Sequence, residues 1–139
     1  DAVRKLHCAS RLDAYTANVD RTWANPHLLV WHRDLWLIDH GAALYFHFGW
    51  PRRSPDPQRY AAQPFDASGH VLADVGPPAG AVHDEAVAAL TPEALAAIVD
   101  TVPEKWLETT DWLPDTDAVR AAYLDHLAAR LANPTAWLS

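Results

Sequence analysis

The sequence predicts a mainly α domain with one small β-hairpin. Apolar residues recur at helical spacing near both ends of the chain, between residues 3 and 15 and between residues 117 and 132. Between these segments lie two short runs of large apolar and aromatic residues, separated by three polar residues, which is typical of two strands and a tight turn. At 139 residues the chain is long enough to bury a core, and we expect a single domain.

The first predicted helix covers about residues 3 to 15. Its apolar residues recur at three-residue steps without an intervening glycine or proline: Val3, Leu6, Ala9, Leu12 and Tyr15. Cys8 on this helix is expected to be a small core residue, because the sequence places no partner histidine for it. As the only cysteine it cannot form an internal disulfide, which favours a reducing, cytoplasmic location.

The predicted hairpin has strands at residues 27 to 31 and 35 to 38, with its turn near Arg33. An antiparallel hairpin returns the chain beside its own start. Asn25 and Asp39 are therefore expected to approach each other at the open end of the hairpin, although they are far apart in sequence.

Asp20, Asn25 and Asp39 follow the spacing of a kinase catalytic loop and its metal-binding aspartate. Phosphoryl transfer mainly requires a positioned nucleophile and Mg²⁺ held against the phosphate charge. Asp20 would be the base that accepts the proton of the substrate hydroxyl. Asn25 and Asp39 would supply oxygen ligands, which Mg²⁺ prefers.

A second candidate for the catalytic loop is the tetrad His32-Arg33-Asp34-Leu35, which spells the usual kinase signature more literally. The position five residues after Asp34 holds Asp39 instead of an asparagine, and the tetrad falls on the predicted turn. We interpret it as a solvated turn.

Two segments resemble the HipA-like kinase family of bacteria: Asn18-Val19-Asp20-Arg21-Thr22 with Asn25-Pro26, and the stretch from Leu35 to His47. Weaker similarity runs through residues 69–72 and 90–107, so the resemblance covers about three quarters of the chain. It implies the C-terminal lobe of a protein-kinase-like fold that uses ATP, with Asp20 catalytic and Asn25 and Asp39 at the nucleotide-bound metal. The sequence departs from general protein kinases at Asn18, where they have histidine, and at His40, where they have phenylalanine.

Residues 50–80 are rich in proline and glycine and are predicted to form a long connector, at the position of a kinase activation and substrate-binding segment. Arg52 and Arg53 could meet phosphate or an acidic substrate there, although a solvated pair is the more common role of two adjacent arginines. Just before the connector, residues 42–46 are predicted to form a short helix.

The last third of the chain is predicted to be helical. Thr91-Pro92-Glu93 is typical of a helix N-terminus, and this helix should run to about Asp100. A further helix is expected within residues 117–132, ended by Asn133-Pro134. Three tryptophans are expected to be packing anchors for these helices: Trp106, Trp112 and Trp137.

Charge and hydropathy restrict the partners. The formal net charge is −7, which argues against nucleic acid or an anionic membrane as a general partner, and no apolar run approaches the roughly 20 residues of a membrane span. The only lysines, Lys5 and Lys105, do not follow a glycine-rich turn on a predicted strand. We therefore expect the ATP-holding N-terminal lobe to be absent from this chain, which should associate with that lobe or with itself and be inactive alone.

The full protein is accordingly expected to transfer the γ-phosphoryl group of ATP to a hydroxyl, with a protein serine or threonine as the expected acceptor. A small-molecule phosphotransferase and a non-catalytic kinase-like binding module are the alternatives. His40 and His47, seven residues apart, leave zinc as a minor alternative to Mg²⁺.

Overall fold

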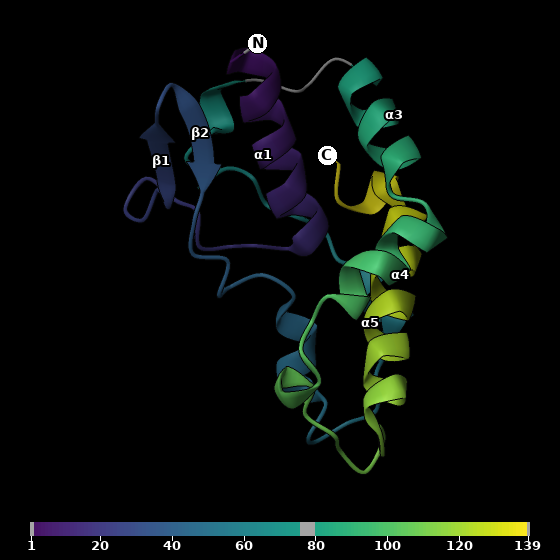
Figure 1. Ribbon diagram of the computed structural model, residues 1–139. Coiled ribbons are helices and arrows are strands. Elements are labelled where there is room, and N and C mark those ends of the chain that lie inside the picture. The colour runs from purple at the N-terminus through teal and green to yellow at the C-terminus, as the bar shows by residue number, and fades with distance from the viewer. Residues whose placement is uncertain (1, 76–79, 139) are drawn as a thin grey trace.

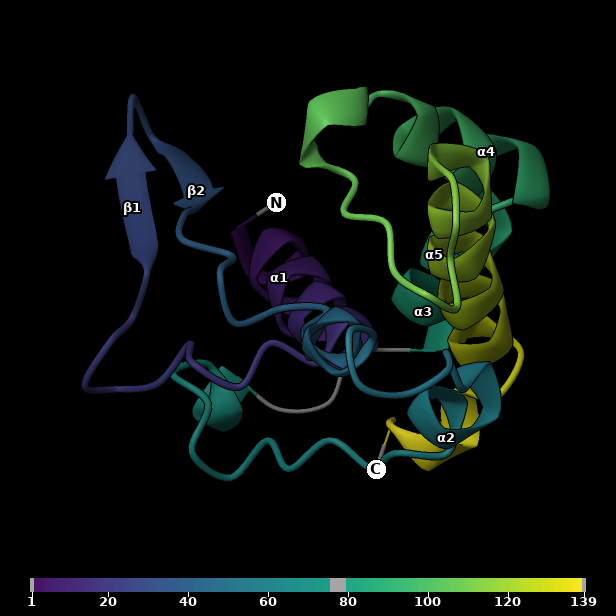
Figure 2. The same cartoon turned by 90° about the horizontal axis from the view of Figure 1, so that it is seen from below.

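The computed structural model describes residues 2–75 and 80–138. It is mainly helical with one two-stranded antiparallel hairpin, which confirms the predicted fold class at this level. The hairpin lies on one side of the molecule, α5 lies on the other, and α1 runs between them (Figures 1 and 2).

Helix α1 (Ala2–Thr16) has the predicted bounds but buries a different face. Val3 and Leu12 are exposed, whereas Asp13 lies in the interior beside Ala14 and Tyr15. Cys8 is also exposed, so its expected core position was wrong. The face that contains Ala9 and Asp13, four residues apart, is turned inward. The helix packs against β2 on one side and against α3 and α5 on the other.

Strands β1 (Leu28–Trp31) and β2 (Asp34–Leu37) pair in the register Leu28 with Leu37 and Trp31 with Asp34. The turn therefore has two residues, His32 and Arg33, and both have positive φ, 50° and 70°. This is the backbone of a type I′ hairpin turn, whose twist matches that of the strands. The predicted turn near Arg33 is confirmed, and the literal kinase tetrad begins in it and ends in β2, which contains Asp34 and Leu35.

Segment 42–46 differs from its prediction, because its only helical part belongs to the 3-10 helix η1 (Tyr45–Gly49). The connector contains two short helices, α2 (Pro57–Ala61) and the 3-10 helix η2 (Ala73–Val75). Asp56 begins α2 by accepting a hydrogen bond from Arg59 N at 3.1 Å. Helix α3 (Gly80–Ala89), which the sequence analysis did not predict, follows the connector.

Helix α4 (Pro92–Asp100) begins as predicted, with Thr91 Oγ1 accepting from Ala94 N at 3.1 Å. After the 3-10 helix η3 (Glu104–Trp106) comes α5 (Thr116–Leu131), which ends before Asn133 and is followed by the 3-10 helix η4 (Pro134–Ala136).

Two apolar clusters form the core. One joins α1, α4, α5 and the chain end around Tyr15, Leu95 and Trp137, and the other packs Trp50 against Leu107 and Val119. Trp137 is 3% exposed, as expected of an anchor. The same expectation was wrong for the other two tryptophans, because Trp106 is 68% and Trp112 is 52% exposed.

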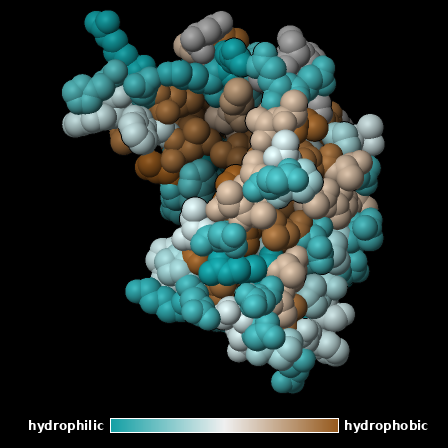
Figure 3. All heavy atoms as spheres, turned by 45° about the vertical axis from the view of Figure 1, so that its right-hand side comes forward, coloured by the Kyte–Doolittle hydropathy of each residue, from teal (hydrophilic) through white to brown (hydrophobic). Residues whose placement is uncertain are grey.

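Hydrophobic residues also reach the surface, where they gather in a hollow in the upper half of the face shown in Figure 3. Within residues 2–75 and 80–138, no helix is both long enough and apolar enough to cross a membrane.

Candidate catalytic loop and hairpin mouth

The loop after α1 is held by a buried polar cluster that consists of Asp13, Asn18, Arg21 and His70. Asp13 accepts from Arg21 Nε at 2.6 Å and from Asn18 Nδ2 at 3.0 Å. His70 Nε2 lies 2.9 Å from the same carboxylate. All four side chains are buried, so their polar atoms must be satisfied by one another and by the backbone.

Burial of the Asp13 carboxylate raises its pKa, but hydrogen bonds from His70, Arg21 and Asn18, together with the Arg21 charge, outweigh burial and hold the pKa of Asp13 below its usual range. His70 is fixed from its other side, where Leu72 N donates to Nδ1 at 3.0 Å. Nδ1 is thus the acceptor, and Nε2 carries the proton that His70 donates to Asp13.

Asp20 lies in the loop that this cluster anchors. Its backbone N donates to Asn18 Oδ1 at 3.3 Å, and its carbonyl accepts from Thr22 N at 3.0 Å. Thr22 also closes the other end of the loop, because its Oγ1 accepts from Asn25 N at 3.2 Å. The loop therefore folds Asn25 back beside Asp20, with Asn25 Nδ2 3.4 Å from Asp20 Oδ1.

Arg21 connects this loop to the hairpin. Its Nη1 donates to the carbonyl oxygen of His27 and, at 3.2 Å, to that of Ile38. Its Nη2 lies 3.4 Å from His40 Nδ1. Ile38 N also donates to His27 O at 3.0 Å, so residues 27 and 38 close the open end of the hairpin. The Arg21 guanidinium thus connects α1 and the Asp20 loop to the segment that contains Asp39 through hydrogen bonds.

Asp39 directly follows this closed pair and has positive φ, 53°. Its side chain is 64% exposed, with Oδ2 3.6 Å from His27 Nε2 and Oδ1 3.4 Å from the backbone N of Gly41. Asn25 is exposed two residues before His27. Asn25 and Asp39 therefore flank the same end of the hairpin, but among the described residues no hydrogen bond joins them.

The donor atoms at this end are compatible with Mg²⁺. The Asn25 amide nitrogen is turned toward Asp20, which leaves its oxygen free, and the carboxylate of Asp39 is exposed to solvent. Mg²⁺ commonly binds through one or two protein oxygens and keeps several waters. The ligand roles of Asn25 and Asp39 stay predictions.

The zinc alternative finds no support in the described residues, where no group of three or more His, Cys, Asp or Glu side chains is placed to hold a metal. His40 lies against Arg21, whereas His47 Nδ1 lies 3.0 Å from the hydroxyl of Tyr123 on α5. The two histidines serve different parts of the fold.

Sequence reasoning did not single out Asp13 or assign a role to His70. Asp13 could have been noticed as the position that completes an i, i+4 face with Ala9, but a lone aspartate in a helix usually faces water. His70 lies 57 residues away and reaches Asp13 only because an isolated bridge pairs Thr22 with His70. Local sequence pattern carries no signal for that approach.

Comparison with known proteins found no matching family model, no matching curated protein and no matching solved structure.

Proposed function

We propose that this chain is the catalytic-loop lobe of a HipA-like kinase, and that the complete protein transfers the γ-phosphoryl group of ATP to a hydroxyl, with a protein serine or threonine as the acceptor. The observation that carries this proposal is the position of Arg21. Its buried guanidinium binds Asp13 of α1 and the carbonyls of His27 and Ile38 at the open end of the hairpin. The loop that contains Asp20 and Asn25 is therefore held beside the segment that contains Asp39.

In this proposal Asp20 accepts the proton of the acceptor hydroxyl as the hydroxyl oxygen bonds to the γ-phosphorus of ATP, while the bond from that phosphorus to the bridging oxygen breaks and ADP leaves. Asn25 donates to the Asp20 carboxylate through its amide nitrogen, and its amide oxygen would be one ligand of the metal. Asp39 would supply the second oxygen ligand. Mg²⁺, when bound, would neutralise charge on the ATP phosphates. A glycine-rich phosphate loop and a strand lysine are further requirements of the complete enzyme, and a cytoplasmic location would supply its ATP.

The proposal is tested by phosphoryl transfer from γ-labelled ATP in the complete protein, comparing Asp20→Asn with Asp34→Asn. Asp34 is the aspartate of the literal kinase tetrad and is paired with Lys5 at 2.6 Å on an exposed surface. Loss of transfer in Asp20→Asn with retention in Asp34→Asn is the expected result. The opposite pattern would move the catalytic loop to the hairpin turn and refute the proposal.

A binding module is the second candidate, and the hairpin surface favours it. Five large apolar side chains of the hairpin are at least 45% exposed: Leu29, Val30, Trp31, Trp36 and Ile38. A groove of about 510 Å³ is also lined by residues of α1 and β2, among them Leu12, Leu35 and Leu37. Exposed apolar surface of this kind commonly binds another protein surface. In the kinase proposal the same surface would contact the ATP-binding lobe or a second copy of the chain.

A further inference from the structure

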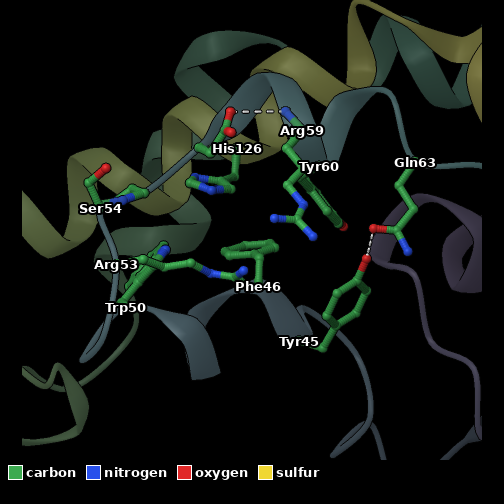
Figure 4. A pocket seen from close by; sticks show the side chains of 11 residues that line it. Tyr45, Phe46, Trp50, Arg53, Ser54, Arg59, Tyr60, Gln63 and His126 are labelled. Atoms are coloured by element: carbon green, nitrogen blue, oxygen red, sulfur yellow. Dashed lines mark hydrogen bonds between the residues drawn. The ribbon is translucent and has the colours of Figure 1, made fainter.

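A pocket of about 450 Å³ lies between η1, α2 and α5, and none of Asp20, Asn25 or Asp39 lines it. Phe46 and Trp50 come from the segment around η1, Tyr60 comes from α2 and His126 comes from α5 (Figure 4). Its volume is within the range of 300–1,000 Å³ that is typical of small-molecule sites. The wall at Tyr60 is fixed, because the Tyr60 hydroxyl donates to the carbonyl of Tyr15 at 2.8 Å.

Two arginines in this pocket are unpaired. Figure 4 shows the side chains of Arg53 and Arg59 extending over Phe46 toward the middle of the pocket. Within residues 2–75 and 80–138, neither guanidinium forms a hydrogen bond or an ion pair. Their donors are therefore available to a ligand.

The position of Arg53 depends on a glycine. A Cβ placed on Gly49 would lie 2.7 Å from Arg53 Nε and 3.0 Å from Arg53 Nη2, closer than real contacts allow. The missing side chain at Gly49 thus lets the guanidinium lie against the backbone of η1. Arg52, the adjacent arginine, is exposed like Arg53 and Arg59, but it does not line the pocket.

A third positive charge lies behind the wall. Arg130 is completely buried, with its guanidinium 4.7 Å from the centre of the Tyr60 ring, and it donates to the carbonyls of Tyr60 and Gln63 at 2.7 and 2.9 Å. Asp56 also lines the pocket, with Oδ1 engaged in capping α2. The two lining guanidiniums thus outnumber the single lining carboxylate, with the buried Arg130 behind the wall and Asp125 acting on His126 from outside the lining.

Aromatic rings form much of the remaining lining, which also includes Ser54, Pro55 and Gln63. The His126 ring stacks on Phe46 with ring centres 4.3 Å apart, and Phe46 also meets Tyr60 edge-on at 4.5 Å. His126 Nδ1 lies 2.7 Å from the carbonyl of Ala122, to which it donates, so Nε2 is left as an acceptor. Burial lowers the pKa of His126 and keeps its ring neutral at pH 7. Contact of these ring surfaces with an organic group should be more favourable than their contact with water.

We infer that this pocket binds a phosphate monoester, with its phosphate between Arg53 and Arg59 and its organic group against Phe46 and Tyr60. Guanidinium groups bind phosphate through paired, charge-assisted hydrogen bonds, and two of them can share one dianion. Phe46 and Tyr60 line the same pocket as the two arginines, so an ester with an organic group should bind better than inorganic phosphate. This inference does not depend on the kinase proposal, because it uses none of the residues of the Asp20 site.

Isothermal titration of the 139-residue chain with phenyl phosphate tests the inference. Arg53→Gln and Arg59→Gln should each weaken binding about tenfold or more, the loss expected when charge-assisted hydrogen bonds to an anion are removed. Arg52→Gln is the matched control and should change affinity by less than about twofold, since Arg52 does not line the pocket and a charge that makes no direct contact with the ligand is screened by salt. Equal losses in Arg52→Gln and Arg53→Gln, or no saturable binding, would overturn the inference.

Gly49→Ala provides a second variant that keeps every arginine. Its methyl group should displace the Arg53 guanidinium and weaken phenyl phosphate binding several-fold, with unchanged far-UV circular dichroism. Inorganic phosphate should bind more weakly than phenyl phosphate, and equal affinities would refute the role of the aromatic wall. A phosphotyrosine peptide distinguishes the sources: tighter binding than phenyl phosphate assigns the site to phosphorylated side chains, and equal binding assigns it to small esters. Either assignment stands only with the losses in Arg53→Gln and Arg59→Gln.

Discussion

Arg21 Nε donates to Asp13 Oδ2 at 2.6 Å, and both side chains are fully shielded from solvent. An ion pair in this position is not primarily a source of stability, because removing two charges from water costs about as much as their attraction returns. The main contribution of this ion pair is to position the Arg21 side chain. The pair places the Arg21 guanidinium where it can bind the carbonyls of His27 and Ile38, and so it joins the catalytic-loop candidate to the hairpin.

Asp13→Asn should destabilise the fold by about 3–5 kcal/mol, because the Arg21 charge would remain buried without its counter-charge. Urea unfolding followed by circular dichroism measures the change. Asp34→Asn breaks the exposed pair with Lys5 and is the matched control, for which we expect an unchanged unfolding midpoint. Similar midpoints for Asp13→Asn and the wild type would mean that Arg21 is not held by a buried carboxylate.

Stability should fall as the pH drops below about 6.5, the ordinary pKa of histidine. Burial lowers the pKa of His126 in the folded state, so the unfolded chain takes up the proton first. The contribution of neutral His126 to the free energy of unfolding is therefore complete above about pH 6.5 and is lost progressively as the pH falls below that value. His126→Phe keeps a ring against Phe46 but cannot titrate, and it should flatten the dependence of unfolding free energy on pH between about pH 6.5 and 5. Identical slopes in both proteins would contradict this.

Asp20→Asn in the complete protein should lower turnover by about 10²- to 10⁴-fold, the usual contribution of a general base. ATP affinity should change little, because the proposed metal ligands remain. Steady-state phosphoryl transfer and ATP titration separate the two effects. A variant that loses ATP binding and turnover together would show that Asp20 is a binding residue and not the base.

Asp39→Asn, unlike Asp20→Asn, should affect ATP affinity. It should weaken ATP binding about tenfold in the presence of Mg²⁺, since a carboxylate ligand is replaced by a neutral amide. In EDTA, ATP affinity of the variant should equal that of the wild type, because the effect depends on the ion. Titrations with and without Mg²⁺ provide the comparison. Equal weakening in both conditions would assign Asp39 a purely structural role.

Arg33→Gly should stabilise the protein by about 1 kcal/mol. Arg33 occupies the left-handed region at φ 70°, which costs a residue with a Cβ about 1–2 kcal/mol and glycine very little. Thermal unfolding measures the gain. Arg52→Gly is the control, because Arg52 is exposed and lacks positive φ, and it should not stabilise. A lower midpoint for Arg33→Gly would show that the arginine side chain contributes more than its strained backbone costs.

Much of the fold could be predicted because its signals are local. The α1 bounds, the Thr91 cap and the end of α5 before Asn133 follow from periodicity, capping and proline, all of which act within a few residues. The failures concern burial. Leu12 and Trp106 look like core residues in sequence and are exposed, because what covers a helix face depends on segments far away in the chain.

The features of the candidate site also fall into those that local sequence predicts and those that depend on distant segments. The sequence by itself determined the spacing of Asp20, Asn25 and Asp39 and the hairpin that lies between Asn25 and Asp39. Only the tertiary structure decided that Asp13 faces inward, that His70 approaches it from 57 residues away, and that Arg21 bridges α1 to the hairpin mouth. The physical reason is that spacing is a property of the chain, whereas a buried charge can be tolerated only where distant segments supply its partners.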